Sequence, residues 1–322
     1  MAGKEPEYLV VSHMEPDHSS NIQALATKYP NMKIVGNAKT FQMISQFFTM
    51  DLSNRTVIVK EGDELSLGTH TLTFVMAPMV HWPEVMVAYE KSEKILFSAD
   101  GFGKFGALDT DEDWDCEARR YYFNIVGKYG AQVQALLKKA AALDIAMICP
   151  LHGPILKENL GHYIGKYDIW SSYTPEDDGV LVAYASIHGH TAAAAKEMAE
   201  ILKKKGAKKV VLCDLAREDM AEAVEDAFRY DKLLLAAATY NASVFPCMEH
   251  FLLHLKGKNY QKRRVGILEN GTWAPMAAKT MKSILEGMKE LQICDTVVTI
   301  KSALKEEDRP GMEKLAEELL AK

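Results

Sequence analysis

Cysteine is scarce in this chain, and its spacing excludes two kinds of site. The five thiols are widely separated and form no Cys-x-x-Cys pair: Cys116, Cys149, Cys213, Cys247 and Cys294. A structural zinc site or a built-in rubredoxin-like iron module needs such pairs. An odd, sparse set of thiols is typical of a reducing compartment, so we expect a cytoplasmic protein.

The chain also lacks long apolar runs and long runs of basic residues. No apolar run approaches the length of a transmembrane helix, and nothing at the start resembles a signal peptide, so we expect no membrane association. The formal net charge of -6 and the lack of a basic block argue against nucleic acid as a partner. The length of 322 residues, with 48% hydrophobic and 25% charged residues, predicts a soluble globular chain. That length suggests about two domains.

The chain does contain a dense group of metal-binding residue types near its start. Residues 13–18 read His-Met-Glu-Pro-Asp-His and follow the apolar run 8–11, which predicts a short buried strand. Pro16 argues against a helix here, so we expect the group to lie on a loop at the end of that strand. Histidine and carboxylate ligands suit iron, zinc or manganese.

Three further candidate ligands each follow an apolar strand: His81, Asp100 and His152. Residues at strand ends are easily gathered at one rim of a sheet. With the first group they make seven, which is too many for one four-coordinate zinc. We therefore predict two metals that share Asp100. The full ligand set is His13, Glu15, Asp17, His18, His81, Asp100 and His152.

The secondary-structure pattern divides the chain into two halves. In the first half we predict helices at 19–28 (capped by Ser19 or Ser20), 39–48 and 115–142, strands at 33–36 and 144–149, and a set of antiparallel strands within 55–98. In the second half, strands at 180–185, 210–214, 233–238, 264–269 and 294–300 alternate with helices. Such alternation predicts a doubly wound, five-stranded parallel sheet. The boundary is placed near Pro175, giving domains 1–174 and 175–322.

Three strand-end loops of the second half are suited to a flavin. The first contains Ser186, Ile187, His188, Gly189, His190 and Thr191, and runs directly into a helix whose positive end can hold a phosphate. It lacks the dinucleotide and nucleoside-triphosphate motifs, so a monophosphate such as that of FMN fits better. The other two loops supply amides and flat rings for the isoalloxazine: Thr239, Tyr240, Asn241 and Ala242, and then Asn270, Gly271, Thr272 and Trp273.

Taken together, these motifs resemble those of the flavodiiron proteins. That family joins a metallo-β-lactamase-like domain with a diiron site to a flavodoxin-like domain with FMN. Its pattern of His-x-Glu-x-Asp-His, then His, Asp and His-Gly-Pro is matched by the seven ligands above. The resemblance implies that Asp100 bridges two irons. It assigns His13, Glu15 and His81 to one iron, and Asp17, His18 and His152 to the other.

The resemblance also implies a fold and an activity. The fold would be α+β followed by α/β: a metallo-β-lactamase-like αβ/βα sandwich and then the flavodoxin-like sheet. Family members usually carry several dozen residues before the motif and this chain has twelve, so we expect an N-terminally truncated sandwich. The implied enzyme is an oxidoreductase that reduces oxygen to water or nitric oxide to nitrous oxide. Its electrons come from a rubredoxin or a similar carrier through FMN, in a head-to-tail homodimer or larger assembly.

Two other interpretations remain open from the residues. The sandwich scaffold also serves hydrolases with two zincs, although those usually carry histidine where this chain has Glu15. Alternatively, the chain is an electron carrier that binds FMN and leaves its metal site empty. The metal content of the protein distinguishes both from a flavodiiron oxidoreductase.

Overall fold

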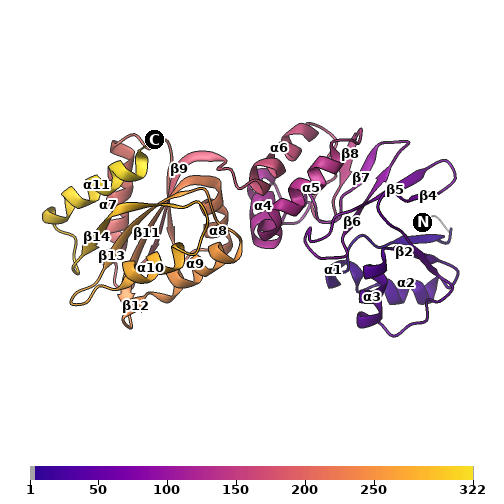
Figure 1. Cartoon of the computed structure of the whole chain (residues 1–322), viewed down its shortest axis with the longest axis horizontal. Coiled ribbons are helices and arrows are strands. Elements are labelled where there is room, and N and C mark those ends of the chain that lie inside the picture. The colour runs from indigo at the N-terminus through magenta and orange to yellow at the C-terminus, as the bar shows by residue number, and fades with distance from the viewer. Residues whose placement is uncertain (1–3, 322) are drawn as a thin grey trace. The chain divides into compact units, whose positions relative to one another are not determined.

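The chain forms two compact units, Met1–Ser171 and Ser172–Lys322, in a computed structural model that describes residues 4–321 (Figure 1). The strands of the first unit are β1 (Tyr8–Val10), β2 (Lys33–Gly36), β3 (Thr56–Ile58), β4 (Glu64–Ser66), β5 (Thr71–Met76), β6 (Met86–Glu90), β7 (Ile95–Phe97) and β8 (Met147–Cys149). Its α-helices are α1 (Pro16–Ser19), α2 (Ile22–Lys28), α3 (Ala38–Phe47), α4 (Trp114–Tyr121), α5 (Gly130–Ala140) and α6 (Leu160–Ser171).

The first unit is a sandwich of two sheets with helices outside. Strands β1, β2 and β3 form a parallel sheet, and β4 to β8 form a second sheet in sequence order. Because side chains alternate across a strand, Phe74 and Met86 face the first sheet and pack against Val35. On the other face of the first sheet, Ile34 packs with α2 and α3 through Ile22 and Ile44. Helices α5 and α6 lie beside β7 and β8 (Figure 1).

Three expectations for this unit are wrong. Residues 16–19 form the short helix α1, because proline is well tolerated at the first position of a helix, where its missing N–H has no partner to lose. The next helix begins at Ile22 after Asn21, not after Ser19 or Ser20. Strand β3 pairs parallel with β2, so only β4 to β7 are antiparallel neighbours. The helical stretch expected at 115–142 is confirmed, and it includes a π-helical segment at Tyr122–Val126 and a 3-10 turn at Gly127–Tyr129 between α4 and α5.

The second unit alternates strands and helices throughout. Its strands are β9 (Asp177–Ala185), β10 (Val210–Asp214), β11 (Tyr230–Tyr240), β12 (Ser243–Val244), β13 (Arg264–Asn270) and β14 (Gln292–Ile300). Its helices are α7 (His190–Lys204), α8 (Met220–Arg229), α9 (Pro246–Gly257), α10 (Ala277–Leu285), a 3-10 turn at Glu306–Asp308 and α11 (Arg309–Leu320). The parallel sheet has the order β10-β9-β11-β13-β14.

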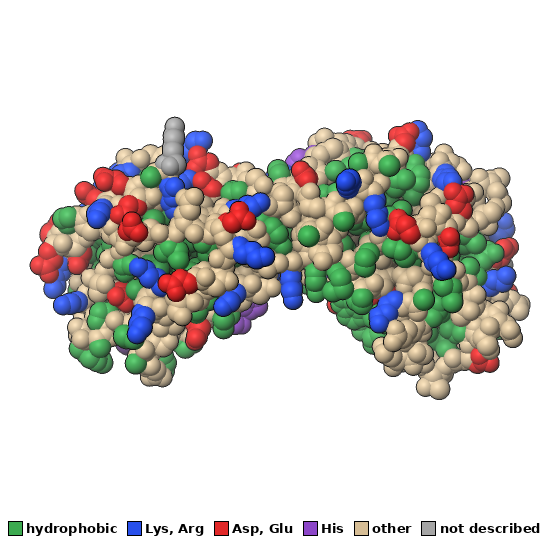
Figure 2. Space-filling model, viewed as in Figure 1, with side chains coloured by type: hydrophobic (Ala, Val, Ile, Leu, Met, Phe, Trp, Pro, Cys, Tyr) green, Lys and Arg blue, Asp and Glu red, His purple; other side chains and the backbone are tan. Residues whose placement is uncertain are grey.

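This sheet confirms the doubly wound fold expected from the sequence. Residues 180–183 and 233–237 have no exposed surface, which explains why these strands read as continuous apolar runs. The short strand β12, which the sequence did not predict, folds back antiparallel onto the end of β11. No helix within residues 4–321 is long and apolar enough to cross a membrane. Figure 2 shows acidic and basic side chains interspersed over the visible face of both units.

Candidate metal centre and flavin site

The seven candidate ligands come from four places in the first unit and meet at one edge of the sandwich. His13 follows β1, Glu15 precedes α1, and Asp17 and His18 lie within α1. His81 lies between β5 and β6, Asp100 follows β7, and His152 follows β8. Strand β6 runs antiparallel to both β5 and β7, so β5 and β7 run in the same direction, and β8 is parallel to β7. The three strands therefore end at the same edge of the sheet.

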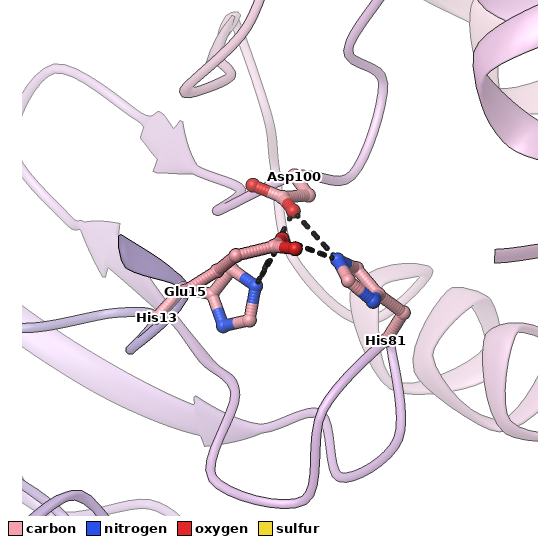
Figure 3. Close-up of side chains that lie close together, drawn as sticks. All are labelled: His13, Glu15, His81 and Asp100. Carbon is pink, nitrogen blue, oxygen red and sulfur yellow. Dashed lines mark hydrogen bonds and ion pairs between the residues drawn. The ribbon is translucent and has the colours of Figure 1, made fainter. Parts of the chain in front are cut away.

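Four of these side chains converge on one point (Figure 3). Nε2 of His81 lies 3.0 Å from Oε2 of Glu15 and 3.2 Å from Oδ2 of Asp100. Nε2 of His13 lies 3.4 Å from the same two oxygen atoms. These four groups therefore place their donor atoms around a single small volume.

A second group lies on the other side of Asp100. Nε2 of His18 is 3.3 Å from Oδ2 of Asp17, and Nε2 of His152 is 3.2 Å from that oxygen. The second carboxylate oxygen of Asp100, Oδ1, lies 3.1 Å from His18 and 3.9 Å from His152. Asp100 thus turns one oxygen toward each group, which is the geometry of a carboxylate that bridges two cations.

Glu84 supports the first group and was missed from the sequence. Its side chain is completely buried, and Oε1 accepts hydrogen bonds from Nδ1 of His13 at 2.8 Å and from the backbone N–H of Met14 at 2.7 Å. Because Nδ1 then carries the proton, the lone pair of Nε2 is free to face the site. The sequence His-Trp-Pro-Glu at 81–84 places this carboxylate three residues after a candidate ligand, which is the signal that could have revealed it.

The charges within the site hold Asp100 ionised. Burial alone would raise the pKa of Asp100, but the neighbouring His18 and His81 hold it far below its ordinary value. Burial likewise opposes the charged form of His81, yet Asp100 and Glu15 raise the pKa of that imidazole. Tyr121 of α4, also missed from the sequence, lies with its ring 5.5 Å from that of His152. Burial and then the charge of Asp100 raise the pKa of its phenol, so it stays protonated.

The site fits a pair of cations. Nε2 of His13, Nε2 of His18 and Oδ1 of Asp100 are buried, and within residues 4–321 none of them makes a well-aligned hydrogen bond, although each lies 3.1–3.4 Å from an oppositely charged group. Leaving such groups unsatisfied costs about 1–3 kcal/mol each. Donor atoms that each lie about 2.1 Å from one shared metal are about 3.0–3.4 Å apart, and the contacts above fall in that range except for the longer one to His152. Histidines with carboxylates suit iron.

The candidate flavin site lies at the carboxyl edge of the second unit's sheet. It is a cavity of about 770 Å³, a size typical of ligand pockets. Every loop residue proposed from the sequence lines it except Gly189, which sits between His188 and His190 and caps α7. Gly189 has φ of 94°, and apart from its chain neighbours no described atom lies within 4 Å of where its Cβ would be. Among the described residues, no side chain caps α7, so its first N–H groups face an open cradle suited to a phosphate.

The rest of this pocket suits a flat ring. Asn241 and Ala242 both have positive φ, in the tight turn that joins β11 to β12. Trp273 is 91% exposed and Tyr240 is 43% exposed, so both rings are available to a ligand. Ser302, which the sequence analysis missed, lies after β14 and is held by Asn270 through two hydrogen bonds of 2.8 and 3.1 Å. Its position at the end of the neighbouring parallel strand is what could have revealed it.

Comparisons with known proteins give matches to both units. The family described as "ODP family beta lactamase" matches residues 2–153, and the flavodoxin domain family matches residues 181–303. An uncharacterized protein of Methanocaldococcus jannaschii is 31% identical over 314 residues, covering 94% of this chain and 78% of that protein. The anaerobic nitric oxide reductase flavorubredoxin of Aliivibrio fischeri is 29% identical, over 83% of this chain and 56% of its own length.

Solved structures give the same result. The rubredoxin oxygen:oxidoreductase of Desulfovibrio gigas superposes with a TM-score of 0.91 at 26% identity, covering 99% of this chain and 82% of that chain. A flavo di-iron protein variant of Thermotoga maritima superposes with a TM-score of 0.86 at 25% identity, over 97% and 79% of the two chains. This chain therefore belongs to the flavodiiron proteins, oxidoreductases built on FMN and a pair of irons.

Proposed function

We propose that this chain reduces oxygen to water, nitric oxide to nitrous oxide, or both, with electrons supplied by a rubredoxin-type carrier. The observation that carries the proposal is the division of the seven donor groups into two sets that share Asp100. Similarity to a rubredoxin oxygen:oxidoreductase and to a nitric oxide reductase flavorubredoxin supports both gases as substrates.

Each set of residues has a distinct part in this proposal. The FMN supplies stepwise electron transfer, and the pair of irons supplies the place where the gas is reduced. His13, Glu15 and His81 would hold one iron, and Asp17, His18 and His152 the other, with Asp100 between them. Glu84 would hold the ring of His13 through Nδ1, so that Nε2 faces the site. The cradle before α7 would hold the FMN phosphate, and the loops at 239–242 and 270–273 would hold its ring.

The deciding experiment combines cofactor analysis with rapid mixing. Iron and FMN are quantified on one anaerobic sample, and the reduced protein is then mixed with oxygen or with nitric oxide in a stopped-flow instrument. Two irons per FMN and fast reoxidation by at least one gas are expected. The relative rates identify the preferred substrate.

Two other outcomes would overturn the proposal. Zinc in place of iron, together with hydrolytic activity, would identify a dizinc hydrolase of the same scaffold. A full complement of FMN with an iron content near zero would identify an electron carrier. Glu15 favours iron over the hydrolase, because its carboxylate stands at a position that those hydrolases usually fill with histidine.

We also propose a head-to-tail homodimer, in which the FMN of one subunit serves the irons of the other. The test mixes a His81→Ala chain, deficient in metal, with a Gly189→Asp chain that binds FMN weakly and has been stripped of it by dialysis. Recovery of gas reduction after subunit exchange supports the arrangement. Mixed dimers without activity contradict it.

A further inference from the structure

An apolar cavity lies behind the metal centre, on the helix-covered face of the second sheet. Its volume is about 20 Å³, and it is separate from the flavin pocket. Val75 and Val87 form its floor on β5 and β6, and Val133 and Leu137 close it from α5. The described side chains around it present carbon to its interior.

The inner end of the cavity reaches the turns that carry two metal ligands. Val80 lines the cavity and directly precedes His81, while Gly101 and Phe102 line it and directly follow Asp100. Polar atoms of the turn that carries Asp100 form hydrogen bonds with other protein groups: Oγ of Ser98 donates to the carbonyl of Gly101 at 2.6 Å. The N–H of Phe102 donates to the hydroxyl of Tyr167 at 2.7 Å. The wall next to the ligands is therefore apolar.

The outer end is less enclosed. Leu136, Leu137, Ala140 and Leu143 are only partly buried, whereas Val80 and Val133 at the inner end are 3% and 1% exposed. The cavity thus extends from a partly exposed side of α5 toward the turns at His81 and Asp100. A small molecule that enters near Leu137 would need to cross only apolar contacts to reach the ligand-bearing turns.

We infer that this cavity binds the diatomic gas substrate and supplies it to the metal centre, an inference that rests on the proposed function. Water is a poor occupant, because it needs two to four polar partners and this site offers it none among the described residues. Oxygen and nitric oxide are uncharged and form weak hydrogen bonds at most, so they lose little on leaving water. The volume exceeds the ~10–15 Å³ needed for one water-sized molecule.

Occupancy is tested with oxygen itself as the probe. Methyl resonances of the oxidised, FMN-bound full chain are recorded under nitrogen and then under oxygen pressure. The oxidised protein does not consume the gas, so the difference reports contact with dissolved oxygen. Paramagnetic relaxation should rise severalfold more for Val133, which is 1% exposed, than for Leu252 and Leu315, which are equally buried in the second unit. Equal enhancement at Val133 and at the two reference leucines would overturn the inference.

Supply is tested by filling the cavity. Val133→Leu adds one methylene, a volume comparable to that of the cavity, and Leu137→Phe fills the outer end with little risk to folding because Leu137 is partly exposed. Both variants should lose the oxygen-induced relaxation. Their second-order rate of reoxidation should fall severalfold at limiting gas, with unchanged iron content. The matched control is Val59→Leu, which adds the same methylene to the core between the two sheets.

An unchanged gas-limited rate in a filled variant would overturn the supply role. If the wild-type protein consumed neither gas, the proposed function would fail, and the relaxation measurement would still decide whether gas occupies the cavity. Thermal unfolding of all three variants separates a filled cavity from a strained core, because overpacking costs about 1–3 kcal/mol.

Discussion

The two units of this chain build their sites in different ways. In the first, seven His, Asp and Glu side chains from separate segments form two adjacent groups, one largely buried and one partly exposed, and the backbone only sets their positions. In the second, an open pocket is made largely by backbone turns at the ends of parallel strands, such as the left-handed Gly189 before α7. The first site therefore depends on which side chains are present, and the second depends on the conformation of its loops.

The largest expected effect is the loss of a side chain from the metal centre. His81→Ala removes a donor that lies 3.0 Å from Glu15 and 3.2 Å from Asp100, so we expect loss of most of the iron and of gas reduction. FMN content should be unchanged, because the pocket lies in the other unit. Metal analysis and the flavin spectrum measure both on one sample. His70→Ala is the control, since His70 lies in the turn before β5 and contacts Glu90 instead of the site. Concurrent loss of FMN would mean that the units do not bind their cofactors independently.

A smaller effect is expected from the group that orients a ligand without touching the metal. Glu84→Gln keeps the shape of the side chain but weakens its hold on the Nδ1 proton of His13. Such supporting residues typically contribute about 10–100-fold to metal affinity. Iron retention against increasing chelator measures the change, and Glu64→Gln on the exposed strand β4 is the control. Glu84→Asp should restore part of the affinity. A loss of folding stability without a change in iron retention would assign Glu84 a purely structural part.

In the second unit, the matching test adds a negative charge beside the backbone N–H groups that would hold the FMN phosphate. Gly189→Asp places a carboxylate at the mouth of the phosphate site, so FMN affinity should fall by on the order of tenfold. Gly189→Asn is the control, because it is nearly the same size, is uncharged and tolerates positive φ similarly. Fluorescence titration of the apoprotein with FMN gives the two affinities. Equal weakening by both substitutions would show that the backbone, not the charge, is responsible, and iron content should stay constant throughout.

The smallest expected effect is a difference in salt dependence between two carboxylates, Glu90 in the first unit and Asp178 in the second. The pKa of each is lowered to about 2. The pKa of Glu90 is lowered mainly by hydrogen bonds from the backbone N–H groups of Glu93 and Ser92, with a smaller contribution from His70. The pKa of Asp178 is lowered by the ammonium groups of Lys208 and Lys232. Because both pKa values lie below those of the unfolded chain, each group's contribution to stability is present above about pH 4.5 and is lost as the pH falls toward 2. Concentrated salt screens exposed ion pairs. Carboxyl NMR titrations should then show the pKa of Asp178 rising with salt and that of Glu90 holding constant.

The sequence predicted the second unit closely and the first one less well. Buried strands such as 180–185 and 233–238 are apolar and separated by helices, and only a parallel sheet covered on both faces accommodates that pattern. In the first unit, the sequence pattern around Pro16 argues against a helix, yet Pro16 occupies the first position of α1, where proline is compatible with one. The pairing of β3 with β2 was also missed, because a strand's own sequence does not specify its partner.

By itself the sequence determined which residues could carry the chemistry. The types and order of His13, Asp100 and His152, and the turn-forming loop before α7, identify the metal and flavin ligands that this chain can offer, because the donor atoms belong to the side chains themselves. Only the tertiary structure decided that Asp100 turns one oxygen toward each group and that Glu84 binds Nδ1 of His13. It also decided that an apolar cavity lies behind the metal centre. These features depend on contacts between segments up to about 140 residues apart in the sequence. The packing of the whole unit sets how close such segments lie in space.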